Sequence, residues 1–131
     1  MNRAGPAALT AGSQNREITM ASDTASALAH RFLEVLNAAD GRAAAALVAD
    51  DVAFDWAGED RQIGRDALRE RLVRFAAEER ASVSDVEIMA NASDTRAAAE
   101  FTLRAGEAAS AAAFFEADGG RISRVTLYRG R

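Results

Sequence analysis

The stretch DDVAFDWAGEDRQIGRD, residues 50–66, contains the only tryptophan of the chain. Its first part, VAFDWA, is rich in residues that favour strands. We therefore expect a strand with Phe54 and Trp56 on one face and Asp55 on the other. The following GEDRQIG reads as a polar turn. The tryptophan thus stands at the end of a short strand, where its ring faces the same side as Phe54.

Three helices are expected around this strand. Residues 22–41 begin with the cap candidates Ser22 and Asp23, carry apolar residues at helical spacing and end at a glycine. Residues 41–51 predict a second, alanine-rich helix, and residues 65–80 predict a third. The apolar stripe of this third helix consists of Ala67, Leu68, Leu72 and Phe75.

The rest of the chain predicts strands. Four segments of strand length are separated by the short turns NASD, GE and DGG. They are residues 82–90, 95–105, 107–117 and 121–129. Helices come early and strands late, so we expect an α+β fold with the order ααβα followed by an antiparallel meander, in which helices pack on one face of a curved sheet.

Composition narrows the classes of function. The chain has 131 residues, which suits one domain, and a net charge of −4, which argues against nucleic acid as a partner. With no cysteine and one histidine, thiolate and histidine-rich metal sites are excluded, and no cofactor is expected. Alanine fills much of the core and buries little area per side chain, so we expect an oligomer.

The two ends of the chain differ in pattern. Residues 1–20 lack periodicity and a continuous apolar run, which predicts a disordered arm rather than a signal peptide, and residues 21–131 are expected to form the domain. No apolar run approaches the ~20 residues of a membrane span. We therefore expect a cytoplasmic protein without a membrane partner.

Three segments carry a resemblance to a known superfamily: FLEVLNAADGRAAAALVADDVAFDW (32–56), IGRDALRERL (63–72) and DGGRISRVTLY (118–128). With them the chain resembles the nuclear transport factor 2-like superfamily, in particular its SnoaL-like and ketosteroid isomerase-like branches. The resemblance implies a cone made of helices and a curved antiparallel sheet. It also implies a ligand that enters the open end, and homodimers formed through the outer face of the sheet.

The resemblance further implies that catalytic positions of the family hold inert side chains here. Phe32 stands where the isomerases have an oxyanion-binding tyrosine, Trp56 where they have a proton-shuttling carboxylate, and Ala112 where they have a protonated acid. Limonene-epoxide-hydrolase-like members have Tyr and Asn at the positions of Phe54 and Trp56, and an Asp near Leu127. Trp56 is therefore expected either to line a pocket or to fill the core as an ordinary buried aromatic.

We expect an apolar ligand site inside the cone. Its predicted lining is Phe32, Phe54, Trp56, Leu72, Ala112, Phe114, Val125 and Leu127, with Arg129 able to close the mouth over an anionic substituent. Asp55 is a candidate acid only if a β-bulge turns it inward. Glu100 is a candidate base if it is buried, and otherwise part of an outer surface or dimer interface.

Three hypotheses follow. The first is a homodimeric cone that binds a small apolar molecule. The second is an enzyme of the same fold, of the polyketide cyclase, isomerase, dehydratase or epoxide hydrolase type, that uses a relocated acid such as Asp55 or Glu100. The third is a structural dimerisation module with a filled cone.

Overall fold

A computed structural model describes residues 24–38 and 40–130 of the chain, with helices first and most strands after them. The predicted arm at residues 1–20 and the predicted caps Ser22 and Asp23 lie outside the described residues. The helices are α2 (Ala25–Ala38), α3 (Gly41–Ala45) and α4 (Arg65–Ala77). The strands are β1 (Val48–Asp55), β2 (Gln62–Ile63), β3 (Ser82–Ala90), β4 (Arg96–Ala105), β5 (Glu107–Asp118) and β6 (Arg121–Arg129).

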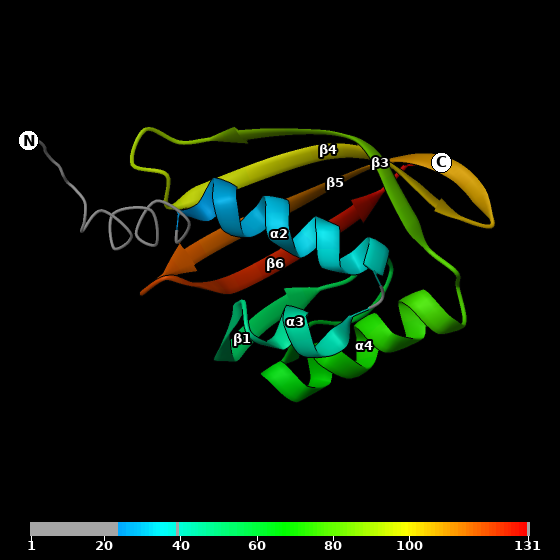
Figure 1. Cartoon of the computed structure of the whole chain (residues 1–131), viewed down its shortest axis with the longest axis horizontal. Coiled ribbons are helices and arrows are strands. Elements are labelled where there is room, and N and C mark those ends of the chain that lie inside the picture. The colour runs from blue at the N-terminus through cyan, green and yellow to red at the C-terminus, as the bar shows by residue number, and fades with distance from the viewer. Residues whose placement is uncertain (1–23, 39, 131) are drawn as a thin grey trace, which may run out of the picture.

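The strands form one sheet in the order β2-β1-β6-β5-β4-β3 (Figure 1). β3, β4, β5 and β6 are the antiparallel meander expected from the sequence. The expectation of a wholly antiparallel sheet is wrong at one place, because β1 pairs with β6 in parallel. A parallel pair needs a long connection, which α4 and the first three meander strands supply. The predicted α+β class is confirmed, with a mixed sheet.

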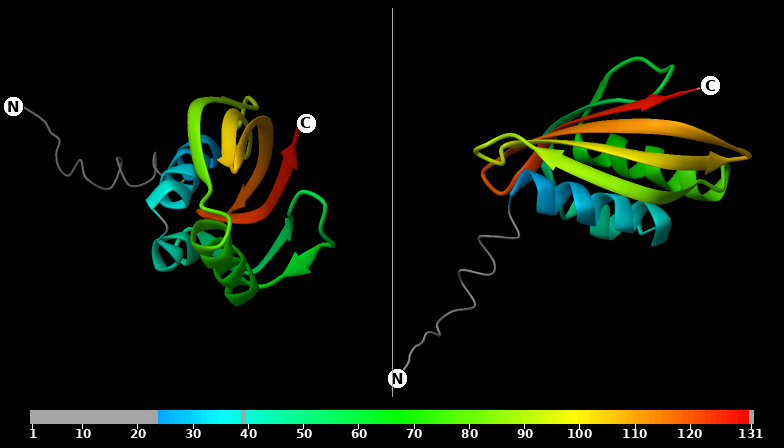
Figure 2. Two further views of the ribbon diagram at one scale, coloured as in Figure 1. Left: turned by 90° about the vertical axis from the view of Figure 1, so that its right-hand side faces the viewer. Right: turned by 90° about the horizontal axis from the view of Figure 1, so that it is seen from above.

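The helices lie in one layer against the inner face of the sheet. α2 contacts β3, β4, β5 and β6, whereas α4 contacts β1 and β2, and α3 lies between the two helices. The sheet curves around this layer without closing, as the two further views show (Figure 2). Within the described part of the chain, no helix is both long and apolar enough to cross a membrane.

β1 begins earlier than the sequence predicts. The second helix ends at Ala45, and the strand starts at Val48, so Asp50 and Asp51 lie in the strand rather than in a helix-to-strand turn. Val48 is fully buried and pairs with Ile122 of β6. Burial of β-branched residues against a neighbouring strand therefore overrides the helix preference of the preceding alanines.

The end of β1 follows the expected alternation. Its register against β6 shifts between Val48 and Ala53, and beyond this point Phe54 and Trp56 are buried whereas Asp55 lies on the other face. The following segment GEDRQIG is expected to be a polar turn, and the structure differs because Gln62–Ile63 form β2, which pairs with β1.

The start of α2 is held by the turn between β3 and β4. The backbone N of Ser26 donates to Asp94 Oδ1 at 2.9 Å, and the Ser26 hydroxyl donates to Asp94 Oδ2 at 2.7 Å. The hydroxyl hydrogen bond lowers the pKa of Asp94 below its ordinary value. A carboxylate from a distant turn therefore satisfies part of the helix N-terminus.

Candidate functional site

The sheet divides the predicted ligand-binding residues into two groups. One group is buried between the sheet and the helices: Phe32, Phe54, Trp56, Leu72, Val125 and Leu127, each 5% exposed or less. Ala112 and Phe114 lie on the outer face, because the buried residues of β5 are Ala111, Ala113 and Phe115. The prediction that these two residues face the same interior as Phe32 is therefore wrong.

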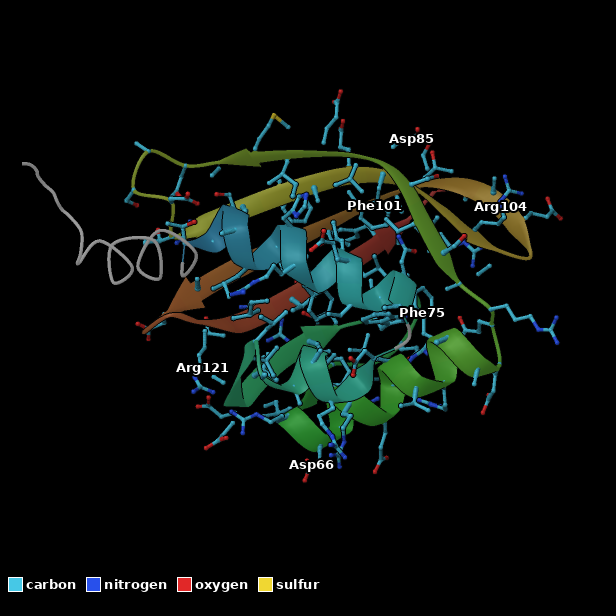
Figure 3. The ribbon with its side chains drawn as sticks, viewed as in Figure 1. Asp66, Phe75, Asp85, Phe101, Arg104 and Arg121 are labelled. Carbon is cyan, nitrogen blue, oxygen red and sulfur yellow. The ribbon has the colours of Figure 1, made fainter. Side chains whose placement is uncertain are left out.

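Aromatic rings fill the buried side of the sheet. Phe32 of α2 and Phe115 of β5 meet edge to face, with ring centroids 5.6 Å apart. Trp56 meets Phe75 of α4 in the same way at 5.1 Å. Figure 3 labels Phe75 near the C-terminal end of α4, on the side of the helix toward α2 and the sheet. Such edge-to-face pairs stabilise a core beyond the area that they bury.

Arg71 of α4 is a functional candidate that sequence reasoning missed. Its residue surface is 4% exposed, and it is the one buried polar or charged residue among those that the structure describes. It follows Leu68 by three positions and precedes Phe75 by four, so it belongs to the buried stripe of its helix. This spacing is the sequence signal that identifies it, since an arginine on an apolar stripe needs a special partner.

Two carboxylates hold the Arg71 guanidinium. Nε and Nη2 donate to the two oxygens of Glu59 at 3.0 and 2.9 Å, and Nη2 lies 3.1 Å from Glu79. The guanidinium carbon lies 5.2 Å from the Trp56 ring centroid and 5.7 Å from that of Phe75, within the range of cation–π attraction. Nη1 is buried and has no hydrogen-bond partner.

A cleft of about 360 Å³ opens beside Trp56, which we call the Trp56 cleft. Its walls come from the loop after β1 and from the end of β6. They consist of residues 55–59, Arg61, Arg124 and residues 126–128. Trp56 and Leu127 therefore belong both to the apolar interior and to the wall of a cleft that reaches solvent.

Asp55 lies in this cleft as half of an ion pair. Arg61 donates to both Asp55 oxygens, at 2.9 and 3.0 Å, and Arg124 lies 3.8 Å from one of them. The hydrogen bonds from Arg61 lower the pKa of Asp55, so the carboxylate is ionised at neutral pH. The register shift in β1 lies before Ala53 and does not turn this side chain inward, so strand alternation leaves Asp55 on the opposite face from Phe54 and Trp56.

The other candidate polar residues meet on the outer face of the sheet. Glu100, Ala112, Tyr128 and Arg129 line an outer cleft of about 470 Å³. Glu100 is exposed, which rules out the buried base considered from the sequence. Arg129 is also exposed, and its Nη2 donates to the backbone oxygen of Ala105 at 3.4 Å. Glu100 and Arg129 thus lie on the opposite side of the sheet from the buried apolar residues, whereas Asp55 shares the Trp56 cleft with Trp56 and Leu127.

Known structures share this architecture. A candidate polyketide cyclase from Xanthomonas campestris pv. campestris superposes with a TM-score of 0.73, at 31% identity over 79% of this chain and 88% of that chain. Another candidate polyketide cyclase, from Pseudomonas putida KT2440, gives 0.71, at 31% identity over 80% and 90%. An LEH-like epoxide hydrolase from M. tuberculosis gives 0.63, at 25% identity over 80% and 81%.

No curated protein matches the sequence. The expected relation to the SnoaL-like branch of the nuclear transport factor 2-like superfamily is confirmed by the fold and by the sequence pattern together. Residues 29–125 match the SnoaL-like domain, and this chain belongs to that family.

Proposed function

We propose that this protein binds a small, mostly apolar molecule at the Trp56 cleft. The observation that carries the proposal is the position of Trp56 and Leu127, which are buried core residues and also walls of a cleft of about 360 Å³. Small-molecule sites commonly have this size, an apolar floor and a few polar groups at the rim. The polar groups in the walls of this cleft include Asp55, Glu59, Arg61, Arg124 and Thr126, and Asp55 is paired with Arg61.

The interior favours binding over acid-base catalysis. Among the described residues no carboxylate is buried, and the one buried charge is the Arg71 cation. Phe32, Trp56 and Leu127, which stand at or near catalytic positions of the resembling enzymes, have no group that transfers a proton. Some structural relatives are named as candidate polyketide cyclases or as an epoxide hydrolase, and these names support the alternative that the protein is an enzyme. That alternative needs an acid outside these positions.

Trp56 fluorescence tests the proposal directly, because the chain has one tryptophan. Tetralin and limonene serve as apolar probes, and we expect both to change the emission in a saturable way. Ala57→Phe places a ring in the cleft wall and is expected to weaken binding about tenfold. Ala108→Phe, the same change at an exposed position of β5, is the matched control.

Two outcomes would contradict the proposal. One is an emission spectrum that no lipophilic probe changes. The other is an equal loss of affinity in the Ala57→Phe and Ala108→Phe variants, with circular dichroism showing that both are folded. Either result would favour the structural module with a filled interior.

We also propose that the outer face of the sheet joins a second copy of the chain. Met89, Phe114 and Tyr128 are 60%, 47% and 57% exposed, and the Phe114 and Tyr128 rings meet edge to face at 5.6 Å. No helix among the described residues covers this face. Arg96 and Glu100 add charges of both signs, so the surface can complement itself about a two-fold axis.

A further inference from the structure

The two carboxylates in the walls of the Trp56 cleft are each held by an arginine. Arg61 Nε and Nη2 donate to the two oxygens of Asp55 at 2.9 and 3.0 Å. Arg71 holds the two oxygens of Glu59 in the same way, at 3.0 and 2.9 Å, and it also pairs with Glu79, which does not line the cleft. Bidentate pairing satisfies a carboxylate in both charge and geometry. A cationic group on a ligand would therefore compete with an arginine at either wall acid.

Arg124 of β6 is the arginine in the cleft wall that lacks such a partner. Its Nη2 lies 3.8 Å from Asp55 Oδ2, which is too far for a hydrogen bond. Among the described residues this contact is its one ion pair, its guanidinium donates no hydrogen bond, and Glu116, its neighbour on β5, is not paired with it. The Arg124 side chain is 39% exposed, so a ligand can reach it from solvent. Because a guanidinium has five N–H donors, Arg124 keeps unused hydrogen-bonding capacity in the wall of the cleft.

The charges next to Arg124 favour an anion over a cation. Asp55 lies between Arg61 and Arg124, so one negative charge faces two positive charges at this part of the wall. An anion beside Arg124 would balance these charges, whereas a cation there would meet two arginines.

The same cleft also offers an apolar surface. Trp56 and Leu127 form part of its wall and are 4% and 5% exposed. An apolar body could pack on these two side chains while an acidic group meets Arg124. The planar, two-oxygen shape of a carboxylate matches the fork of a guanidinium.

We infer that Arg124 binds an anionic group of the ligand, so that the molecule in the Trp56 cleft is an apolar carboxylic acid in its ionised form. This inference rests on the proposed function and specifies its ligand class. Arg124 is then the residue that determines the charge specificity of the cleft.

Calorimetric titration with three derivatives of tetralin tests the inference. They carry a carboxylate, a carboxamide or an ammonium group on the same saturated carbon. The carboxamide has nearly the shape of the carboxylate without its charge, so the informative quantity is the carboxylate-to-carboxamide affinity ratio. We expect the wild-type protein to bind the carboxylate about tenfold more tightly than the carboxamide at low ionic strength, and Arg124→Gln to remove most of this preference. Arg121→Gln, at an exposed position of the same strand outside the cleft wall, should leave the ratio unchanged.

Three further measurements give independent readouts, and they serve also if Arg124→Gln does not fold. Arg124→Lys keeps the positive charge without the planar fork, so it should retain only part of the preference. Asp55→Asn removes the acid that would share Arg61 and Arg124 with the ligand, so the carboxylate should gain affinity relative to the carboxamide. Added salt should weaken binding of the carboxylate and leave binding of the carboxamide nearly unchanged, because the site is partly exposed.

The possible results separate the two proposals. If neither tetralin nor any of its derivatives binds the wild-type protein, the proposed function fails and the inference fails with it. If tetralin and the carboxamide bind and the carboxylate binds no more tightly, only the inference is overturned. The same holds if Arg124→Gln and Arg121→Gln give equal ratios, or if the ammonium derivative binds more tightly than the carboxamide. A weaker dimer with an unchanged ratio in Arg124→Gln would assign this residue to the association surface and would also overturn the inference.

Discussion

The two faces of the sheet are built from the same strands and present different chemistry. In β5, Phe115 points to the helices and is 1% exposed, whereas its neighbour Phe114 points outward and is 47% exposed. Inside, rings and aliphatic side chains surround one buried cation, Arg71. Outside, Phe114 and Tyr128 lie among alanines and charges of both signs. Alternation along a strand thus gives one sheet a packed apolar side and a candidate association surface. The Trp56 cleft takes walls from both, because Trp56 and Leu127 are buried whereas Asp55 and Tyr128 face outward.

The largest difference is expected when the two adjacent phenylalanines are shortened in turn. Phe115→Ala removes a buried ring that meets Phe32, so we expect the free energy of unfolding to fall by about 3–5 kcal/mol. Phe114→Ala removes a half-exposed ring and should cost about 1 kcal/mol or less in the monomer. Urea unfolding at low protein concentration measures both. Equal losses would contradict the assignment of the two faces.

A charged side chain placed on the outer face is expected to weaken dimer formation. Phe114→Arg places a charge in the proposed dimer surface and should raise the dimer dissociation constant about 30-fold or more. Val73→Arg makes the same change at an exposed residue of α4, 51% exposed, and should leave association intact. Sedimentation velocity across micromolar concentrations distinguishes the variants. If the wild-type protein is monomeric at these concentrations, the outer face does not join two copies of the chain.

A smaller effect is expected at Asp94, which binds the start of α2 from the turn between β3 and β4. Hydrogen bonds from Ser26 lower the pKa of Asp94 below its ordinary value of 3.8, so its contribution to stability is complete above that value. This contribution is lost as the pH falls through the lower, folded-state pKa. Asp94→Asn should therefore cost about 1 kcal/mol at neutral pH and little in strong acid.

Urea titrations over a pH series from neutral into strong acid test this dependence, because the cost of Asp94→Asn should shrink as the pH falls. Asp118→Asn, at an exposed position at the end of β5, is the control. A loss for Asp94→Asn that stays equally large throughout the series would show that the ionised carboxylate does not stabilise α2.

The sequence predicts those parts of the fold that depend on local signals. The expected strands at 82–90 and 121–129 coincide with β3 and β6, because Gly-rich or polar turns bound segments with clear strand character. The segment EAASAAAFFEA has no such alternation, and its adjacent phenylalanines fit either face equally well. Only packing against α2 decides that Phe115 is buried.

The candidate site also contains residues that can be predicted from the sequence and one that depends on packing between distant segments. Strand alternation places Trp56 beside Phe54, whereas Leu127 is expected inside from the family resemblance, and both residues are buried. Arg71 is missed because burial of a guanidinium depends on Glu59 and Glu79, which come from a loop and from the residues after α4. The position of Arg71 on the apolar stripe is a sequence signal, but the ion pairs that make its burial possible have no period in the sequence.

We expect the residues on the inner face of the sheet to catalyse neither steroid isomerisation nor epoxide hydrolysis. Steroid isomerisation and epoxide hydrolysis need a carboxylate that moves a proton or activates water, and a donor that stabilises charge on oxygen. Phe32, Trp56 and Leu127 provide none of these groups, and Ala112 lies on the other face. Loss of a single oxyanion donor typically lowers a rate by about 10²–10³, and loss of a whole set leaves little beyond binding.

Assays of purified protein on a Δ5-ketosteroid and on a terpene epoxide should therefore give rates equal to those in buffer. Asp55→Asn and Glu100→Gln should change nothing, because Asp55 is ionised and paired with Arg61 and Glu100 is exposed on the outer face. Turnover above buffer that Asp55→Asn abolishes would identify the Trp56 cleft as an active site. Turnover that Glu100→Gln abolishes would instead place the chemistry in the outer cleft, and the outer face would then hold a reaction site rather than only an association surface.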